Sequence, residues 1–270
     1  MLFGLLAIGL LCGVASAPVP GPTGYSVRSD VDGHLYSINL ATGVATDLGL
    51  VGLSDTQGVE FVGSTLYGIG GTVMEFWDIT TPPGSKIGDT GPRSGIDAGL
   101  AYDLTTGKMY NIQRDLSSSY LYEINLATGA ATSIGSDSRG LPDGLAIDNT
   151  GAAYAIDGLA GALYRLNLGT GALTLIGTSS LPYSECGASF DVGGTLWGIF
   201  DNGGIYTFDT TTGAPTLVST TLAGFEGLAI EVGLPVIPEV PLGTVMSAVA
   251  MIGGLIGYIG TSAFRRRACA

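Results

Sequence analysis

A fifteen-residue pattern recurs along this chain and constrains its fold more than any other feature of the sequence. The clearest copies are LYSINLATGVATDLG from Leu35, LYEINLATGAATSIG from Leu121 and LYRLNLGTGALTLIG from Leu163. Looser copies are IYTFDTTTGAPTLVS from Ile205 and MEFWDITTPPGSKIG from Met74. The first residues of successive copies lie 39, 47, 42 and 42 positions apart. A period near forty residues predicts a repeat architecture.

A second recurring segment precedes four of these copies, so that one repeat contains four short apolar runs. These segments are GVEFVGSTLYGIG from Gly58, GLAYDLTTGKMYNI from Gly99, GLAIDNTGAAYAID from Gly144 and GASFDVGGTLWGIF from Gly187. In the third repeat the four runs are 100–103, 108–112, 120–125 and 131–135. Within one run Tyr122, Ile124 and Leu126 share one face of a pleated strand, and Gly129 can take the positive φ of the following turn. Four antiparallel strands per unit predict the blade of a β-propeller.

The two ends of the array complement each other. The pattern begins midway, with GYSVRSD from Gly24 and LYSINLATG from Leu35, and ends with an orphan GLAIEVG from Gly227. Pairing of 228–231 with the N-terminal strands would close a ring and remove two exposed sheet edges. We therefore predict an all-β fold, a propeller of five four-stranded blades over residues 24–233. An open solenoid is less favoured because it would not predict a C-terminal strand that completes the first repeat.

Charge narrows the range of partners. Of the 270 residues, 45 are Gly, which suits a chain with many turns. Between Pro18 and Ile237 there are 22 acidic and 7 basic side chains, a net charge of −15. Such a field repels nucleic acid and anionic lipid surfaces, so we expect no nucleic-acid partner. Solubility and cation binding are the natural uses of this charge.

Both ends of the chain carry apolar segments. Residues 1–17 read as a secretory signal peptide, cut after Ala15, Ser16 or Ala17, and 18–23 as a linker. Residues 242–264 contain no charge and, at about 1.5 Å per residue, are long enough for a transmembrane helix. The cluster Arg265, Arg266 and Arg267 within the tail 265–270 should stay in the cytoplasm and leave the repeats outside.

The segment 234–241 joins the repeats to this helix as a stalk. Its IPEVPLG sequence, the apolar helix and the arginine cluster together resemble C-terminal sorting tails of the PEP-CTERM and PEF-CTERM type. The matching positions are Pro238, Glu239, Pro241 and Gly243. The resemblance implies processing by an exosortase or archaeosortase and a protein that is membrane-anchored or released at the cell surface. A plain stalk before a permanent anchor is the alternative.

The repeats themselves resemble secreted propeller domains built from LYxI-(N/D)-xxTGxxTxIG units, broadly akin to YVTN and NHL-type surface propellers. The resemblance covers about 24–233 and implies the architecture, because Tyr, Ile and Gly at these positions are explained by strand packing and turns. No catalytic residue is carried over from it.

One acidic residue precedes the Gly of each predicted innermost strand. These residues are Asp55, Asp97, Asp143, Glu185 and Glu226. In a propeller such loops meet at the mouth of the central channel, where crowded carboxylates favour a hard cation with oxygen ligands. The sequence thus suggests a Ca²⁺ site, and the alternative is that these are ordinary loop residues.

Candidate catalytic groups are few. The single His, His34, lies beside Asp32 in a turn and reads as a solvated loop residue, and Cys186 reads as a small buried hydrophobe. We expect a non-catalytic module on the cell surface that binds an extracellular protein or a glycan. The alternative is an extracellular hydrolase or lyase, glycosidase-like, that uses two carboxylates of the channel. Trp77 and Trp197, both placed inside strands, do not add an aromatic platform.

Overall fold

The computed structural model describes residues 21–29, 31–71, 74–91, 97–181 and 184–231, and every regular element within these ranges is a β-strand. They belong to one compact unit that extends to Val232. The predicted signal peptide, the sorting motif and the predicted transmembrane segment with its arginines lie outside the described residues. In the ranges that are described, no helix could span a membrane.

The strands form five antiparallel four-stranded sheets, numbered here as blades and given from the inner to the outer strand. Blade 1 contains β20 (Ala229–Ile230), β1 (Thr23–Val27), β2 (His34–Asn39) and β3 (Ala45–Leu50). Blade 2 contains β4 (Thr56–Val62), β5 (Thr65–Gly70), β6 (Glu75–Asp78) and β7 (Ser85–Asp89). Blade 3 contains β8 (Asp97–Asp103), β9 (Lys108–Arg114), β10 (Ser119–Ile124) and β11 (Ala131–Asp137). Blade 4 contains β12 (Gly144–Ile147), β13 (Ala153–Asp157), β14 (Ala162–Leu166) and β15 (Leu173–Thr178). Blade 5 contains β16 (Cys186–Phe190), β17 (Leu196–Phe200), β18 (Gly204–Phe208) and β19 (Pro215–Thr220).

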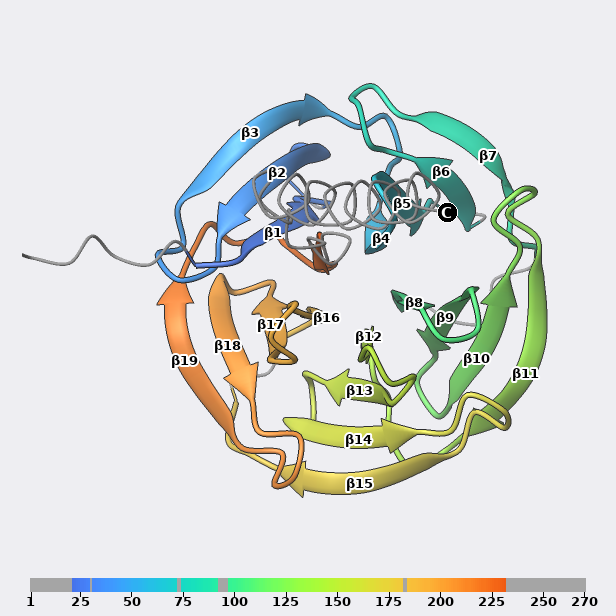
Figure 1. Cartoon of the computed structure of the whole chain (residues 1–270), viewed down its shortest axis with the longest axis vertical. Coiled ribbons are helices and arrows are strands. Elements are labelled where there is room, and N and C mark those ends of the chain that lie inside the picture. Colours follow the sequence, from blue (N-terminus) through green and yellow to red (C-terminus); the bar gives the residue numbers. More distant parts are fainter. Residues whose placement is uncertain (1–20, 30, 72–73, 92–96, 182–183, 232–270) are drawn as a thin grey trace, which may run out of the picture. The chain divides into compact units, whose positions relative to one another are not determined.

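The blades are arranged in a ring around a central axis (Figure 1). Strands β4, β8, β12 and β16 lie near the axis, and β3, β7, β11, β15 and β19 form the outer wall. The prediction of an all-β propeller with five four-stranded blades is therefore confirmed.

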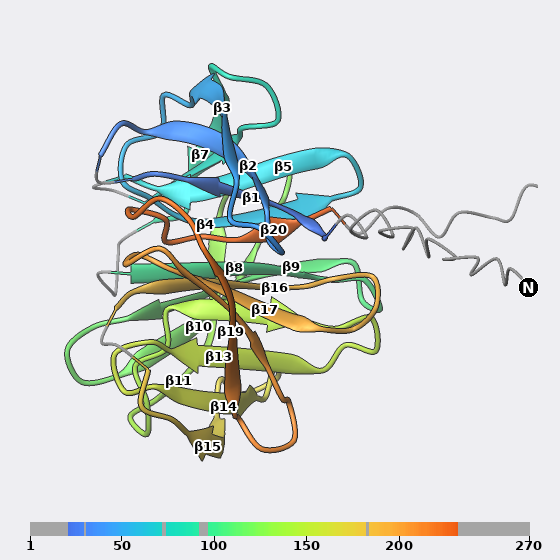
Figure 2. The same cartoon turned by 90° about the vertical axis from the view of Figure 1, so that its left-hand side faces the viewer.

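Closure of the ring is achieved by the strand at the end of the array. β20 pairs with β1, with Gly24 opposite Ile230 and Tyr25 opposite Ala229, and lies beside β4 of blade 2 and β16 of blade 5 (Figure 2). The side-chain hydroxyl of Ser26 donates to the carbonyl of Gly227 and extends the junction. The predicted completion of the N-terminal blade by the C-terminal strand is thus confirmed.

The hydrophobic core is divided into five clusters, one between each pair of neighbouring blades. In β2, Leu35 packs against blade 2, whereas Tyr36 and Ile38 pack against blade 5. Side chains that alternate along a strand thus serve two different interfaces, since both faces of every blade are covered. The strands of a blade therefore carry apolar side chains on both of their faces.

The turn in the middle of each copy of the repeat has a local cause. In blade 3, Oδ1 of Asn125 accepts the backbone N–H groups of Ala127 and Thr128 at 2.9 and 3.1 Å, and Gly129 donates to the Asn125 carbonyl at 2.8 Å. Gly129 has φ of 73°, as its predicted role required. Around Asn39, Asn167 and Asp209 the side-chain oxygen likewise accepts the N–H two residues on, and the turn glycine donates to the same residue's carbonyl.

Each outer strand pair also contains a β-bulge. Between β10 and β11 the register jumps from Leu121 opposite Gly135 to Tyr122 opposite Ser133, so that Ile134 is the extra residue. Equivalent irregularities occur in the outer pairs of the other four blades. A bulge increases the local twist, which lets the outer strand wrap the ring.

Candidate functional site

The inner strands approach one another so closely at one end of the ring that the axis is closed there. The glycines of the inner strands lie at this point: a Cβ on Gly99 would lie 2.5 Å from the Asp143 carbonyl, and one on Gly227 would lie 3.0 Å from the Gln57 carbonyl. The space that the five strands enclose at this level has no room for a water molecule. A ligand therefore cannot thread the axis past these glycines.

The five predicted acidic residues lie at the starts of the five inner strands. Asp55, Asp143 and Glu185 directly precede β4, β12 and β16, Asp97 is the first residue of β8, and Glu226 lies three residues before β20. Because these strands enclose one axis and begin at the same end of it, the five backbones lie around this end. The side chain of Asp97 lies outside the described residues.

The Asp143 side chain has a structural role, because it is buried and hydrogen-bonded to two blades. Its side chain, 4% exposed, accepts the backbone N–H of Cys186 at 3.2 Å and that of Gly158 at 3.4 Å. The Cys186 thiol also donates to it, with Sγ 3.4 Å from Oδ1. Burial, followed by the negative charge of Asp143, raises the pKa of Cys186 well above its usual value, so the thiol stays protonated. Cys186 is buried, and Asp143 joins blade 4 to blade 5.

Glu185 is paired with a cation that sequence analysis missed. The guanidinium of Arg114, at the end of β9, contacts it with Nη2 3.1 Å from Oε1. The Arg114 side chain is 4% exposed, and the pair reaches from blade 3 to blade 5. At least one of the crowded carboxylates is thus neutralised by an internal arginine.

The other two acids differ in exposure. Asp55 is half-buried, has a φ of 51° and accepts Nε2 of Gln57 at 3.1 Å, whereas Glu226 is 5% exposed. Across the described ranges, no three His, Cys, Asp or Glu residues are grouped closely enough to hold a metal ion. The Ca²⁺ site stays a prediction from sequence.

Another buried acid, Glu60 in β4, was not predicted. Its side chain faces blade 3, where it accepts the backbone N–H of Tyr102, and Oε1 also accepts the N–H of Phe61 at 2.7 Å. Burial raises its pKa to about 8. At the same distance from the inner-strand glycine the other blades have Ala101, Ala146, Ser189 and Ala229.

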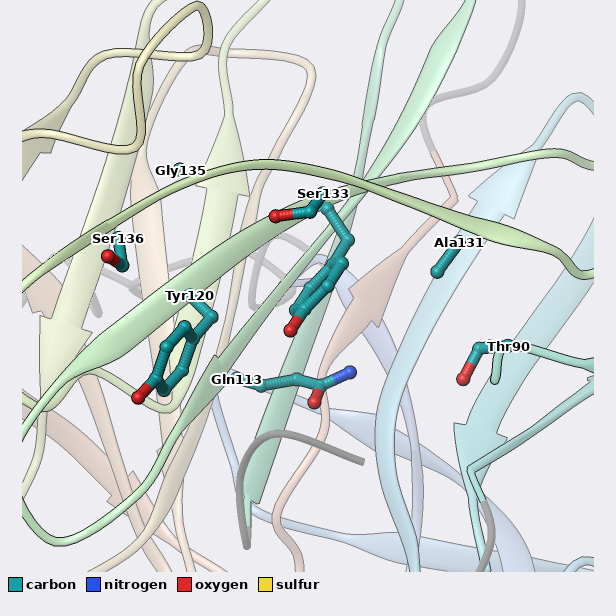
Figure 3. A pocket seen from close by; sticks show the side chains of 8 residues that line it. Thr90, Gln113, Tyr120, Ala131, Ser133, Gly135 and Ser136 are labelled. Carbon is teal, nitrogen blue, oxygen red and sulfur yellow. The ribbon is translucent and has the colours of Figure 1, made fainter. Parts of the chain in front are cut away.

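A cavity of about 550 Å³ opens on the side of blade 3 that faces blade 2. Two cross-strand rows build it, Gln113–Tyr120–Ser136 and Asn111–Tyr122–Ser133, running from β9 through β10 to β11. Thr90, which follows β7 of blade 2, lines the opposite side. Figure 3 shows Tyr120, Gln113, Ser133 and Thr90 arranged around this space.

The lining is polar, aromatic and uncharged. Gln113 is 2% exposed and donates from Nε2 to Oδ1 of Asn111 at 2.8 Å, and Asn111 donates from Nδ2 to the Gly99 carbonyl at 2.8 Å. The Tyr120 hydroxyl donates to Oδ2 of Asp115 at 2.8 Å. Both side chains are therefore held in place before any ligand arrives. The cavity lay outside the sequence-based site because Gln113 and Tyr120 are not part of the repeated pattern.

The remaining candidate residues, His34, Trp77 and Trp197, make hydrogen bonds within their own blades. His34 is the first residue of β2, and its Nδ1 lies 2.9 Å from the carboxylate of Asp47. Trp77 lies in β6 with Nε1 donating to Glu75 at 3.0 Å, and Trp197 lies in β17 with Nε1 donating to Asp191 at 2.8 Å. Each of the three side chains thus has an acidic partner in its own blade, which accounts for its position without a ligand.

Comparison with known proteins agrees with the repeated architecture. A family model described as a repeat of unknown function (DUF6923) matches residues 66–227. The chain belongs to this family. The DUF6923 match begins in β5 of blade 2 and ends just before β20, so it covers the part of the ring in which the blades follow one another without the closing strand.

The DUF6923 repeat ring is similar to solved structures at the level of fold. A chain in the "Crystal structure of Nidogen/Laminin Complex" matches at 15% identity with a TM-score of 0.51, covering 76% of this chain and 83% of that one. A structural genomics protein of unknown function from Bacteroides thetaiotaomicron VPI-5482 matches at 16% identity with a TM-score of 0.48, covering 73% of this chain and 50% of that one. No curated protein matches the sequence.

Proposed function

We propose that this protein is a non-catalytic binding module displayed outside the cytoplasm. The observation that carries the proposal is the cavity between blades 2 and 3, whose volume lies in the range of ligand sites, about 300–1,000 Å³. Its side chains are held by hydrogen bonds within blade 3, as in a preorganised binding site. A rigid ring carrying such a cavity fits recognition of an extracellular partner, in keeping with the binding and scaffold roles that propeller folds serve.

Display at the cell surface follows from the sequence of the two ends. The apolar segment 1–17 would direct export, and the tail with Pro238, Glu239 and the apolar stretch 242–264 would anchor the protein or be cut by a sorting enzyme. Protease treatment of intact expressing cells should degrade the ring, and a chain ending at Gly233 should be released into the medium. Full protection of the ring on intact cells would contradict this placement.

Binding and catalysis are separated by one experiment with isolated cell envelopes as the probe. The full-length chain, purified in a detergent without a sugar headgroup, should co-sediment with the envelopes to a greater extent than Ser133→Arg, which carries the same apolar tail. Ser133 is exposed at the cavity, so the arginine fills the cavity without disturbing the core. Retention unaffected by Ser133→Arg would contradict a role for the cavity.

The hydrolase alternative predicts a different result. It requires two carboxylates that reach a substrate, whereas Asp143 is bound by backbone groups of blades 4 and 5 and Glu185 is paired with Arg114. Soluble fragments that accumulate with time in the envelope assay, and that Asp143→Asn abolishes, would favour the hydrolase. A constant soluble fraction supports the binding module.

A further inference from the structure

We propose that the cavity on blade 3 binds an uncharged saccharide, an inference that rests on the binding role proposed above and names its ligand class. The first argument is charge. Among the described residues, the eight that line the cavity include none with a side chain that is ionised at neutral pH, although the chain carries 23 acidic residues. A charged ligand would lose its hydration there without gaining a counter-charge, and an anion would also meet the acidic field of the ring.

The second argument is hydrogen-bonding capacity. Thr90, Tyr120, Ser133 and Ser136, which carry hydroxyl groups, and Gln113, which carries a carboxamide, line one space. An apolar ligand would strip water from these groups and return nothing. A saccharide carries hydroxyls that both donate and accept, so it can replace the water around the exposed hydroxyls of Ser133 and Ser136.

The third argument is the pair of aromatic rings. Tyr120 and Tyr122 stand two residues apart on β10, so both project from the same face of the blade into the cavity. A pyranose ring presents a face of C–H groups that packs on an aromatic ring, and a tyrosine combines that apolar face with a polar edge.

Comparison of the blades distinguishes ligand residues from packing residues. The position of Tyr122 is aromatic in all five blades, as Tyr36, Trp77, Tyr164 and Tyr206, so the repeat itself requires it. The position of Tyr120, by contrast, is His34, Glu75, Ala162 and Gly204 elsewhere. Tyr120 and its cross-strand neighbour Gln113 are specific to blade 3, and both line the cavity.

The orientation of Tyr120 is fixed from outside the cavity. The Asp115 carboxylate accepts a hydrogen bond from the Tyr120 hydroxyl. A hydrogen bond from the Ser117 backbone N–H, together with the one from Tyr120, lowers the pKa of Asp115 to about 2. The carboxylate is therefore ionised at any physiological pH. The hydroxyl oxygen of Tyr120 accordingly presents its lone pairs, as an acceptor for a sugar hydroxyl.

The test is calorimetric titration of the full-length chain, in a detergent without a sugar headgroup, with defined neutral oligosaccharides, acidic oligosaccharides and extended peptides. Neutral saccharides should bind, and Tyr120→Ala should weaken that binding about tenfold, while Tyr120→Phe keeps most of it. His34→Ala, at the same position of blade 1, should bind like the wild type. Ser133→Arg should abolish binding at unchanged melting temperature.

Three results would overturn the proposal: binding of acidic saccharides or peptides in place of neutral ones, absence of binding by all neutral saccharides, or neutral binding that survives both Tyr120→Ala and Ser133→Arg. The envelope assay separates this failure from failure of the proposed function. Retention that depends on Ser133 but is not competed by neutral saccharides would leave the binding module standing and remove only its ligand class.

Discussion

The carboxyl group of Glu60 occupies a position that is Ala or Ser in the other four blades, and its pKa of about 8 links the stability of the ring to pH. The pKa is raised above the unfolded value near 4.5, so the folded state holds the proton more tightly. This contribution is fully present below about pH 4.5 and is lost as pH rises through about 8. At about 1.4 kcal/mol per pKa unit it is on the order of a few kcal/mol.

We predict that Glu60→Gln removes this pH dependence. The amide keeps an acceptor for the N–H groups of Phe61 and Tyr102 and has no proton to lose. Between pH 5 and pH 8.5 the melting temperature of the wild type should fall by several degrees more than that of Glu60→Gln. Glu123→Gln, an exposed acid paired with Lys108, is the control and should keep the wild-type slope. Parallel curves for the wild type and Glu60→Gln would refute this assignment.

The Arg114–Glu185 pair should matter more than a surface pair of the same type. Arg114→Met leaves Glu185, which is 36% exposed, without its guanidinium and removes a buried side chain, so it should cost about 1–3 kcal/mol of unfolding free energy. The control is Lys108→Met, since the Lys108 and Glu123 side chains of that pair are 46% and 38% exposed, and we expect at most about 1 kcal/mol there. Equal losses in urea unfolding of the two variants would show that the Arg114 pair is not structural.

At the scale of elements, the repeated Thr-Gly turn contacts the neighbouring blade. A methyl group on Gly135, at the bulge of β11, would overlap the carbonyl oxygen of Thr170 in the turn of blade 4. The same contact joins Gly88 to Thr128 and Gly177 to Thr212. The two glycines of the TGxxTxIG pattern thus have distinct roles: the first makes the turn, and the second admits the turn of the next blade.

This contact gives a prediction with a matched control. Gly135→Ala should lower the unfolding free energy by about 1–3 kcal/mol, because the obstructing atom belongs to the backbone. At about 2–4 °C per kcal/mol, thermal unfolding resolves that loss. Gly169→Ala, where the nearest atom is 3.4 Å away and the other blades carry Ala41 and Ala127, should be neutral or slightly stabilising. A Gly135→Ala variant as stable as Gly169→Ala would contradict the contact.

The sequence could predict the features that all or most blades share. The period, the four strands per unit and the turn at Gly129 are all repeated features, and reading them gave the right architecture. Arg114, Gln113 and Tyr120 are features of one blade, so a search for repetition passes over them. The surroundings of Asp143 depend on Gly158 and Cys186, which reach it only through tertiary contact, and no local pattern encodes that.

At the scale of the whole molecule, closure depends on a very short strand. β20 contributes two residues to the ladder with β1, and its neighbours Phe225 and Leu228 fill the cluster between blades 1 and 5. An unclosed ring exposes that cluster and the edge of β1.

We therefore predict different behaviour for two truncated chains. A chain ending at Gly233 keeps β20 and should unfold in one cooperative transition. A chain ending at Gly227 loses β20 and Leu228 and should unfold over a broad range at a melting temperature at least about 10 °C lower, since it lacks several kcal/mol of apolar burial. Both lack the same apolar tail, so the difference reports β20 alone. Coincident unfolding curves would show that the ring does not need its closing strand.

The pairing of β20 with β1 also means that the chain could be joined at this blade and opened between two others. Ile230 lies opposite Gly24 on adjacent antiparallel strands, so a short hairpin turn could join the end of the array to its beginning. A circular permutant joined in this way and opened at the exposed Ser138, between blades 3 and 4, would contain no blade assembled from both ends of the chain. At the new opening between blades 3 and 4 its ring would be held shut only by side-chain packing and turn contacts. The natural order adds a hydrogen-bonded strand, β20, at the point where the repeat array ends.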